Sequence, residues 1–132
     1  MSLEVTRADD FESALRAAVR ERAEAFIIPS DSLYTANRVQ LVGLAAKYRL
    51  PAMYDFRDFT EAGGLMAYGP SIQEAYRQAA RHVDKILKGV KPGDLPVEQS
   101  ARFEFTINQQ AAQALGITFP PSILLQVTDV IQ

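Results

Sequence analysis

The chain has 132 residues, 48% hydrophobic and 23% charged, which is the ordinary composition of a soluble globular protein and enough length for one domain. Its formal net charge of -2 gives no general reason to bind nucleic acid or an anionic membrane, and no apolar run is long enough to span a bilayer. Cysteine is absent and His82 is the only histidine, so disulfides and thiolate metal sites are excluded and a histidine-based catalytic or metal cluster within one subunit is implausible.

The first residues carry no secretory signal, because Met1 to Leu3 are followed by Glu4 without a basic or an apolar region. As given, the chain would stay in the cytoplasm, and Met1 to Leu3 could equally be a remnant of cloning. The segment Leu3 to Thr6 predicts a short strand, and Asp9 or Asp10 then begins a helix. The apolar face of this helix consists of Phe11, Ala14, Leu15 and Ala18.

The next segments alternate between strand and helix. Ala25 to Pro29 is a compact apolar run that predicts a buried strand, and the oxygen-rich Ser30 to Ser32 suit a turn or a helix N-cap. A helix is predicted from Thr35 to Tyr48, followed by a strand at Ala52 to Tyr54 and a short helical turn at Asp55 to Phe59. The side chains that this helix is expected to bury are Val39, Leu41, Leu44, Ala45 and Tyr48.

The stretch from Glu61 to Ser71 joins a strand to the longest predicted helix. Gly63 and Gly64 allow close backbone approaches that other residues resist. Leu65 to Ala67 are apolar without alternation, as in a strand that is covered on both faces. The Gly-Pro pair after Tyr68 is expected to break the strand, and the serine that follows can cap a helix from Ile72 to about Lys88.

The last third of the chain begins with this long helix, for which Gly89 is well placed as the C-cap. Its apolar positions recur at helical spacing: Ile72, Ala75, Tyr76, Ala79, Ala80, Val83, Ile86 and Leu87. After a loop at Lys91 to Pro96, the alternation of Phe103 to Ile107 predicts a half-exposed strand. Asn108 then caps a short helix to Leu115, and Pro120 to Ser122 begin a last helical turn.

Strands that alternate with helices at these spacings predict an α/β fold. We expect a single domain over residues 1–132, with a mainly parallel sheet, right-handed crossovers and helices on both faces. In such a sheet, ligands bind at the carboxyl ends of the strands, and this rule gathers candidate ligand-binding residues from three segments. They are Ser30, Asp31, Ser32, Tyr54, Asp55, Tyr68 and Gly69. Their rings, carboxylates and hydroxyls could stack on a flat ring and hydrogen-bond an ammonium or carboxylate group.

Each of these segments also has a purely structural interpretation. Ser30 to Ser32 is, taken alone, more often just a turn and cap; Asp55 could be solvated or paired with Arg57; and Tyr68 could be a core ring with its hydroxyl at the surface. Two carboxylates near one cleft could also indicate acid/base chemistry, but the sequence holds neither a nucleophile-base pair nor a phosphate loop. We therefore predict no enzyme activity, no catalytic residues, no metal site and no cofactor.

Several runs, taken together and in this order, resemble a known family. They are Leu50 to Tyr54, Glu61 to Pro70, Asp84 to Gly89, Lys91 to Glu98, Phe105 to Asn108 and Ala114 to Ile117. None of these runs is specific alone, but the combination is. Along nearly its whole length the chain is similar to the substrate-binding proteins of ABC transporters, in the branch that includes tryptophan- and tyrosine-binding members.

The resemblance implies a type I periplasmic-binding-protein fold, in which two α/β lobes joined by a hinge close on a small ligand. This sequence resembles only the C-terminal lobe; the signal peptide, the first lobe and the first strand-helix unit of the second are missing. In the family, the helix that matches Ser71 to Lys88 would pack with the first lobe, and the ligand-facing positions would map onto the seven candidates named above. The implied partners are a small solute, such as an aromatic amino acid, and a transporter permease. The intact family would be periplasmic or lipid-anchored outside the cell.

Without the first lobe, the apolar face of Ile72 to Leu87 would be exposed, at a cost of roughly 1.5–3 kcal/mol for each large side chain. We therefore expect a homodimer, formed through this helix or through an exposed sheet edge. The predicted function is solute binding for an ABC importer, with Tyr54 or Tyr68 stacking on the ligand and Ser30 to Ser32 binding its polar groups. Two alternatives stay open: a truncated lobe that folds as a dimer and binds nothing tightly, and a small enzyme or ligand sensor.

Overall fold

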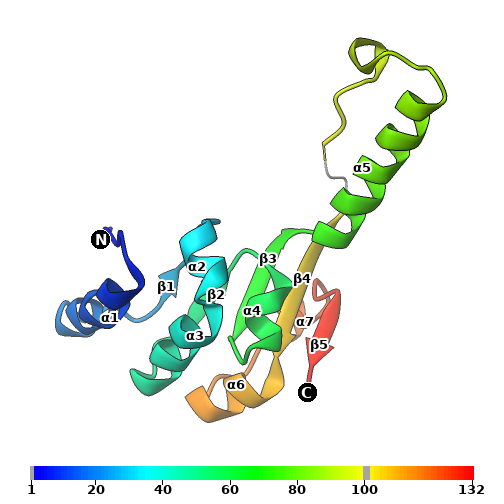
Figure 1. The fold of residues 1–132 in the computed structure, drawn as a ribbon. Helices are drawn as coiled ribbons and strands as arrows, with labels where there is room; N and C mark the ends of the chain where they lie inside the picture. Colours follow the sequence, from blue (N-terminus) through cyan, green and yellow to red (C-terminus); the bar gives the residue numbers. More distant parts are fainter. Residues whose placement is uncertain (1, 100–101) are drawn as a thin grey trace. The chain divides into compact units, whose positions relative to one another are not determined.

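The structure is a computed structural model that describes residues 2–99 and 102–132 (Figure 1). The chain divides into two compact units, one formed by Met1–Gly69 with Glu104–Gln132 and the other by Pro70–Phe103. Among the described residues, none of the helices combines the length and the hydrophobicity that a membrane span needs.

One sheet of five strands has the order β1-β2-β3-β4-β5. The strands are β1 (Phe26–Ile27), β2 (Ala52–Tyr54), β3 (Met66–Pro70), β4 (Phe103–Asn108) and β5 (Asp129–Ile131). β1, β2 and β3 are parallel to one another, and β4 is parallel to β5. The backbone N–H of Asn108 donates to Leu65 O, and that of Ser71 donates to Arg102 O, so β3 and β4 run antiparallel. The predicted mainly parallel sheet is confirmed.

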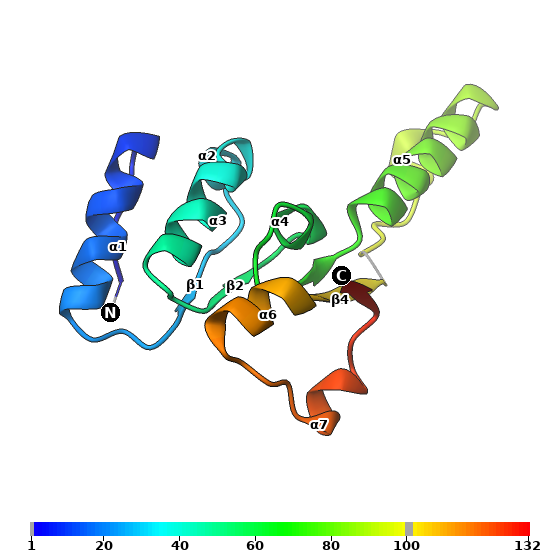
Figure 2. The same ribbon diagram turned by 90° about the horizontal axis from the view of Figure 1, so that it is seen from below.

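Helices lie on both faces of this sheet, as predicted (Figure 2). On one face are η1 (Ala8–Asp10), α1 (Phe11–Arg20), α2 (Ser32–Ala36), α3 (Arg38–Lys47) and α4 (Arg57–Glu61). On the other are α6 (Gln109–Leu115) and α7 (Pro121–Leu124). α6 begins at its predicted cap, because the Asn108 side chain accepts a hydrogen bond from the Ala111 N–H at 2.9 Å, and it ends at Gly116, which follows the last turn.

The main core lies between the sheet and the helices α1, α3 and α4. Phe11 and Leu15 of α1 are buried on the predicted apolar face, and Leu41 of α3 is buried beside them. At the centre, Tyr54 of β2 and Phe59 of α4 are each 1% exposed, and their rings stack with centroids 4.6 Å apart. Burial of such large apolar side chains is the dominant stabilising contribution in a domain of this size.

A buried polar cluster ties α4 to β4. The hydroxyls of Thr60 and Thr106 lie 2.9 Å apart, and the Asn108 side-chain amide donates to Thr60 O at 3.0 Å. Thr60 and Thr106 are almost completely buried, and the Thr60 hydroxyl also reaches Arg57 O. Because the hydroxyls and the amide are paired, the cluster fixes α4 against β4 without leaving these groups unsatisfied.

The second unit consists of a long helix and the segment that returns from it. α5 runs from Ile72 to Leu87, and the returning segment contains a single turn, η2 (Pro92–Asp94). The Ser71 hydroxyl accepts a hydrogen bond from the Glu74 N–H at 3.4 Å, and Gly89 adopts a φ of 99°, which favours glycine. The predicted start and end of this helix are therefore confirmed. None of its side chains is buried.

Several local predictions are wrong. Leu3 to Thr6 forms no strand, because its backbone pairs with no strand in the part of the chain that the structure describes. The helix predicted from Thr35 to Tyr48 is two helices, because the Asn37 side chain donates to Leu33 O at 2.8 Å and ends the first of them. Val39 lies just after this break and is 69% exposed, rather than buried.

The strands also differ from the prediction at two places. β3 continues through Gly69 to Pro70 instead of ending before them. β5 was not expected, because its three residues, Asp129–Ile131, are too few to give a recognisable pattern. Its place is fixed by pairing with β4, with Ile107 opposite Val130.

Candidate functional site

The candidate site lies at the carboxyl ends of β1, β2 and β3. These strands are parallel neighbours, with Ile27 opposite Met53 and Tyr54 opposite Ala67. The next residues along β2 and β3 are Asp55 and Tyr68, which therefore follow at the same level of the sheet. The three segments that the sequence predicted to meet thus end at one edge of the sheet, where ligands of open α/β sheets bind.

The segment after β1 serves as a helix cap. Asp31 Oδ1 accepts a hydrogen bond from the Leu33 N–H at 2.7 Å and so begins α2. Ser30, Asp31 and Ser32 are all exposed. The predicted cap is confirmed, and the hydroxyls of Ser30 and Ser32 lie at the surface where a ligand could reach them.

Tyr54 is a core residue in this structure. Its ring is stacked on Phe59 and is 1% exposed, so it offers no open face to a ligand. Its hydroxyl is enclosed and has no hydrogen-bond partner among the residues that the structure describes. Burial raises the pKa of the Tyr54 phenol, because it disfavours the phenolate. A direct role of Tyr54 in ligand binding stays a prediction.

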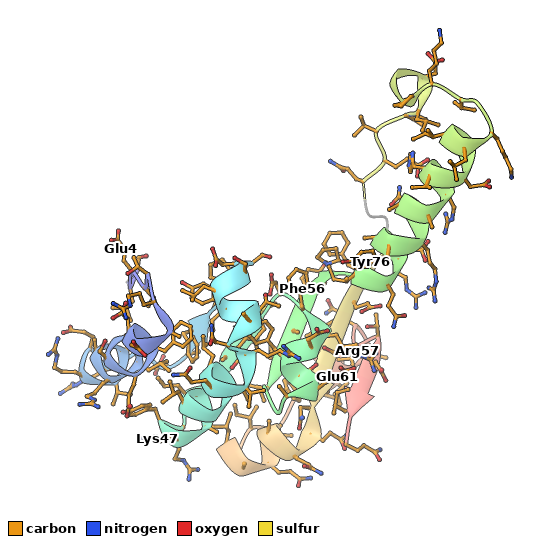
Figure 3. The ribbon with its side chains drawn as sticks, viewed as in Figure 1. Glu4, Lys47, Phe56, Arg57, Glu61 and Tyr76 are labelled. Atoms are coloured by element: carbon orange, nitrogen blue, oxygen red, sulfur yellow. The ribbon has the colours of Figure 1, made fainter. Side chains whose placement is uncertain are left out.

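Asp55 carries the most informative feature of the site. Its Oδ2 atom is enclosed, yet it accepts no hydrogen bond from any residue in the described ranges. The sequence suggested Arg57 as a possible partner. Arg57 instead binds Glu61, with Nε and Oε1 2.7 Å apart (Figure 3), and Asp129, with Nη1 and Oδ2 2.6 Å apart. The hydrogen bonds to these two carboxylates raise the pKa of Arg57.

Tyr68 and Gly69 both lie beside Asp55, but they contribute to the site in different ways. The Tyr68 side chain is 50% exposed, and its ring meets the ring of Phe105 edge-on, with centroids 6.0 Å apart. At Gly69 the backbones of β2 and β3 approach closely, because a Cβ atom there would lie 1.9 Å from Asp55 O. Gly69 is therefore required by packing, while Tyr68 presents an aromatic surface.

The arrangement offers three kinds of group that a ligand could contact. It combines an enclosed carboxylate oxygen without a donor, a half-exposed aromatic ring and two exposed hydroxyls. In the described part of the chain, no group of histidine, cysteine, aspartate or glutamate side chains could hold a metal ion. Sequence reasoning missed the role of Phe105 beside Tyr68, since only the antiparallel β3–β4 pairing makes these two rings neighbours.

Comparison with known proteins agrees with the fold and with the resemblance found in the sequence. Residues 1–131 match the family model of the ABC transporter substrate binding proteins. The chain therefore belongs to this family. Among curated proteins, none matches the sequence significantly.

Three solved structures are similar to this chain. A conserved domain protein from Vibrio cholerae O1 biovar El Tor is 25% identical, with a TM-score of 0.84, over 96% of this chain and 42% of that one. The ABC domain in complex with L-Trp from Streptococcus pneumonia is 24% identical, with a TM-score of 0.87, over 99% of this chain and 44% of that one. The third is the ligand-free, open structure of a substrate binding protein with adhesive properties from Clostridium difficile. It is 19% identical, with a TM-score of 0.69, over 100% of this chain and 44% of that one.

The two structures below 25% identity show a shared fold and nothing more about this chain. The chain spans less than half the length of each of the three proteins. For this chain, the ligands and partners of those whole proteins can therefore only be proposed.

Proposed function

We propose that this chain binds a small solute that carries a protonated amino group and an aromatic ring, such as an aromatic amino acid, and that it does so as part of an ABC importer. The observation that carries the proposal is the enclosed, unpartnered Oδ2 atom of Asp55 at the carboxyl edge of the sheet. Family membership supports a solute-binding role without catalysis.

The Asp55 residue as a whole is partly exposed, and a ligand ammonium group that reaches its carboxylate would satisfy the unpaired oxygen. A buried acceptor without a donor costs about 1–3 kcal/mol, and more when it is charged, so a cationic donor at this position gains that free energy on binding. Tyr68 follows at the same level on the neighbouring strand and is half exposed, and this supports a contact between its ring and the same ligand. The exposed hydroxyls of Ser30 and Ser32 would bind the ligand's carboxylate.

Calorimetric titration tests this proposal with pairs of ligands that differ by one group. We expect L-Trp to bind at least about tenfold more tightly than indole-3-propionate, which lacks the amino group, because each 1.4 kcal/mol changes affinity tenfold. L-Leu, which lacks the ring, should also bind more weakly. L-Trp is the first choice because a protein with this fold was solved with it. Equal affinity for L-Trp and indole-3-propionate would contradict the role of Asp55. If neither aromatic nor other amino acids gave a binding signal, the result would favour a lobe that binds nothing.

The cellular role rests on the family. We propose that the solute is passed to a transporter permease and that the intact protein acts outside the cytoplasmic membrane, either in the periplasm or held there by a lipid anchor. Localisation of the tagged natural gene product by cell fractionation would test this, and recovery only in the cytoplasm would contradict it.

Self-association is a second candidate property, and α5 supports it. Of its apolar side chains, Tyr76, Val83 and Leu87 are 75%, 54% and 82% exposed, and they recur along one helix at spacings of seven and four residues. We expect this chain to sediment as a dimer at micromolar concentration, because pairing two such stripes buries apolar surface worth about 25 cal/mol per Å². The double change Tyr76→Glu with Val83→Glu should give a monomer, whereas Lys85→Glu, on the opposite face of the same helix, should not. A wild-type chain that sediments as a compact monomer would contradict this expectation.

A further inference from the structure

Phe105 is the cross-strand partner of Tyr68. Backbone hydrogen bonds join the β3 segment to the β4 segment at Leu65 and at Ser71, and Tyr68 lies midway between these two residues. Their partners on the β4 side lie three residues before and three residues after Phe105, so Tyr68 and Phe105 stand directly opposite each other. Hydrogen-bonded and non-hydrogen-bonded pairs alternate along an antiparallel ladder. This pair is therefore of the second kind, in which the side chains lie closest together.

The two rings meet at a right angle. Their planes are inclined by 88°, with the centroids 6.0 Å apart, which is the edge-to-face arrangement that aromatic pairs favour. Whichever ring presents its edge, Phe105 covers at most one face of the Tyr68 ring. Phe105 is partly buried, whereas Tyr68 is 50% exposed. Phe105 therefore orients the Tyr68 ring and leaves at least one face of that ring uncovered by Phe105 itself.

The backbone of Phe105 is held firmly from the side of β5. Its N–H donates to the Thr128 hydroxyl at 2.8 Å, and its carbonyl oxygen accepts from the Thr128 N–H at 2.8 Å and from the Thr128 hydroxyl at 3.0 Å. β4 itself lies between β3 and β5 (Figure 1). Since a half-exposed ring changes rotamer readily unless its neighbours hold it, the fixed Phe105 ring is a support against which Tyr68 can rest.

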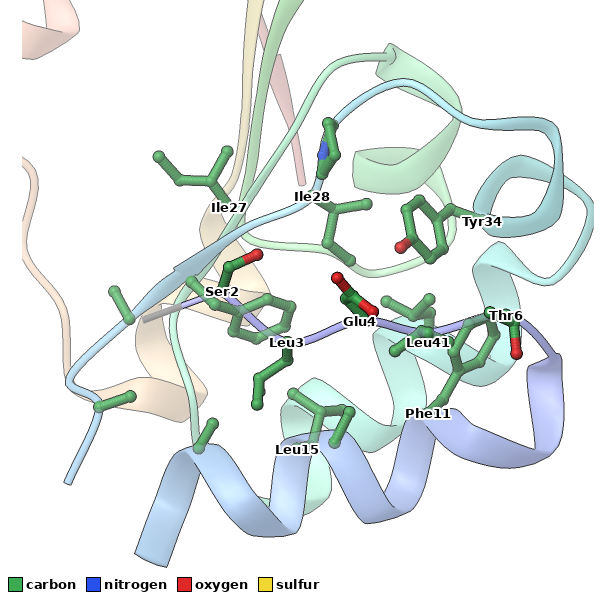
Figure 4. Close-up of a pocket in the computed structure, with 17 residues that line it drawn as sticks. Ser2, Leu3, Glu4, Thr6, Phe11, Leu15, Ile27, Ile28, Tyr34 and Leu41 are labelled. Atoms are coloured by element: carbon green, nitrogen blue, oxygen red, sulfur yellow. The ribbon is translucent and has the colours of Figure 1, made fainter. Parts of the chain in front are cut away.

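The pair lies away from the cavity that Figure 4 shows. That cavity has a volume of about 880 Å³ and is bounded by β1, by α1 and by the first residues of the chain, Ser2 to Thr6. Of the described residues that line it, none belongs to β3 or β4. Both of these strands have a strand neighbour on each side, so the pairing of Tyr68 with Phe105 does not depend on where the sequence begins.

We propose that Phe105 is a positioning residue of the carboxyl-edge site, which holds the Tyr68 ring in one orientation and so sets the preference of the site for aromatic over aliphatic ligands. Phe105 acts through Tyr68 and does not touch the ligand. A ring that is already ordered loses less conformational entropy when a ligand stacks on it. An aliphatic ligand gains less from the ring face, so its affinity depends less on this order. The inference rests on the proposed function.

A double-mutant cycle tests whether Phe105 acts through Tyr68. Calorimetric titration with L-Trp and with L-Leu compares the wild type with Phe105→Leu, Tyr68→Leu and the double variant. We expect Phe105→Leu to weaken L-Trp binding about three- to tenfold, the effect of ordering one side chain, and to leave L-Leu binding unchanged. In the Tyr68→Leu background, the same substitution should change L-Trp affinity by less than about twofold. An equal loss in both backgrounds would overturn the inference.

A conservative variant and a ligand-free measurement complete the test. Phe105→Tyr keeps the ring and should keep L-Trp affinity within about twofold of the wild type. Three-bond couplings measured by NMR without ligand should show one χ1 rotamer of Tyr68 in the wild type and rotamer averaging in Phe105→Leu.

The outcomes separate this inference from the proposed function. An unchanged Tyr68 rotamer in Phe105→Leu, or an unchanged preference for L-Trp over L-Leu, would overturn the inference while the proposed function stands. An equal loss of L-Leu affinity would show that the substitution damages the whole site and would also overturn the inference. If the wild type bound no L-Trp, the proposed function would fail and the inference would fall with it.

Discussion

Replacing Asp55 by asparagine is expected to weaken binding of L-Trp about 10- to 100-fold, because the ligand ammonium loses a charged hydrogen-bond partner worth about 1.5–3 kcal/mol. The substitution keeps the shape of the side chain and removes its charge. Calorimetric titration of the variant and the wild type measures the loss. Indole-3-propionate, which lacks the ammonium group, should bind the two proteins with equal affinity.

Two controls separate a binding role of Asp55 from a structural one. Asp58→Asn, three residues away on the exposed side of α4, should leave affinity for L-Trp unchanged. The ligand-free Asp55→Asn protein should be at least as stable as the wild type in urea, because the Asp55 oxygen has no protein donor to lose in the described structure. A large drop in stability, or an unchanged affinity for L-Trp, would show that Asp55 does not bind the ligand.

Replacing Gly69 by alanine is expected to destabilise the fold by about 3 kcal/mol or more, or to prevent folding. The added Cβ atom would lie 1.9 Å from Asp55 O and 2.9 Å from Asp55 C, and both are backbone atoms that no rotamer change can move. β3 and β2 would have to separate, which breaks the ladder between Tyr54 and Ala67. The midpoint of urea unfolding measures the effect, and the yield of soluble protein replaces it if the variant does not fold.

Gly43→Ala is the matched control for this substitution. Gly43 lies within α3, and a Cβ atom there would meet nothing within 4 Å. Alanine favours a helix interior over glycine, so this variant should be more stable by about 0.5–1 kcal/mol. If Gly69→Ala and Gly43→Ala unfolded at similar urea concentrations, the close approach at Gly69 would have no energetic importance.

Some elements were predictable because their signals are local. The strand at Ala52 to Tyr54, the long helix from Ile72 and the short helix after Asn108 all lie where the sequence predicted them. In each case the evidence is contained in a few neighbouring residues: a capping side chain, an apolar period or a glycine after the last turn. The family resemblance was likewise readable from short runs, and the family match confirms it.

Other features depend on partners that are distant in the chain. Leu3 to Thr6 has a plausible strand sequence but forms no strand, since a strand exists only where a neighbour supplies the other half of the ladder. β5 is the opposite case: Asp129–Ile131 has little strand character of its own, but it pairs with β4. The ion pair between Arg57 and Asp129 could not be predicted either, because α4 and β5 bring together two residues that lie 72 positions apart in the sequence.

The same distinction between local signals and distant contacts applies to the candidate site. The sequence by itself determined the α/β class, the strand ends and the residue types at the carboxyl edge, because periodicity and turn chemistry are local properties. Only the tertiary structure decided which of those side chains are buried, which are exposed and which lack a hydrogen-bond partner. Stacking on Phe59 places the Tyr54 ring in the core. Arg57 pairs with Glu61 and Asp129, and Asp55 Oδ2 is left without a donor in the described structure. Packing on Phe105 leaves the Tyr68 ring half exposed. The physical reason is that burial and hydrogen-bond satisfaction depend on contacts between distant segments, which exist only after the sheet has formed.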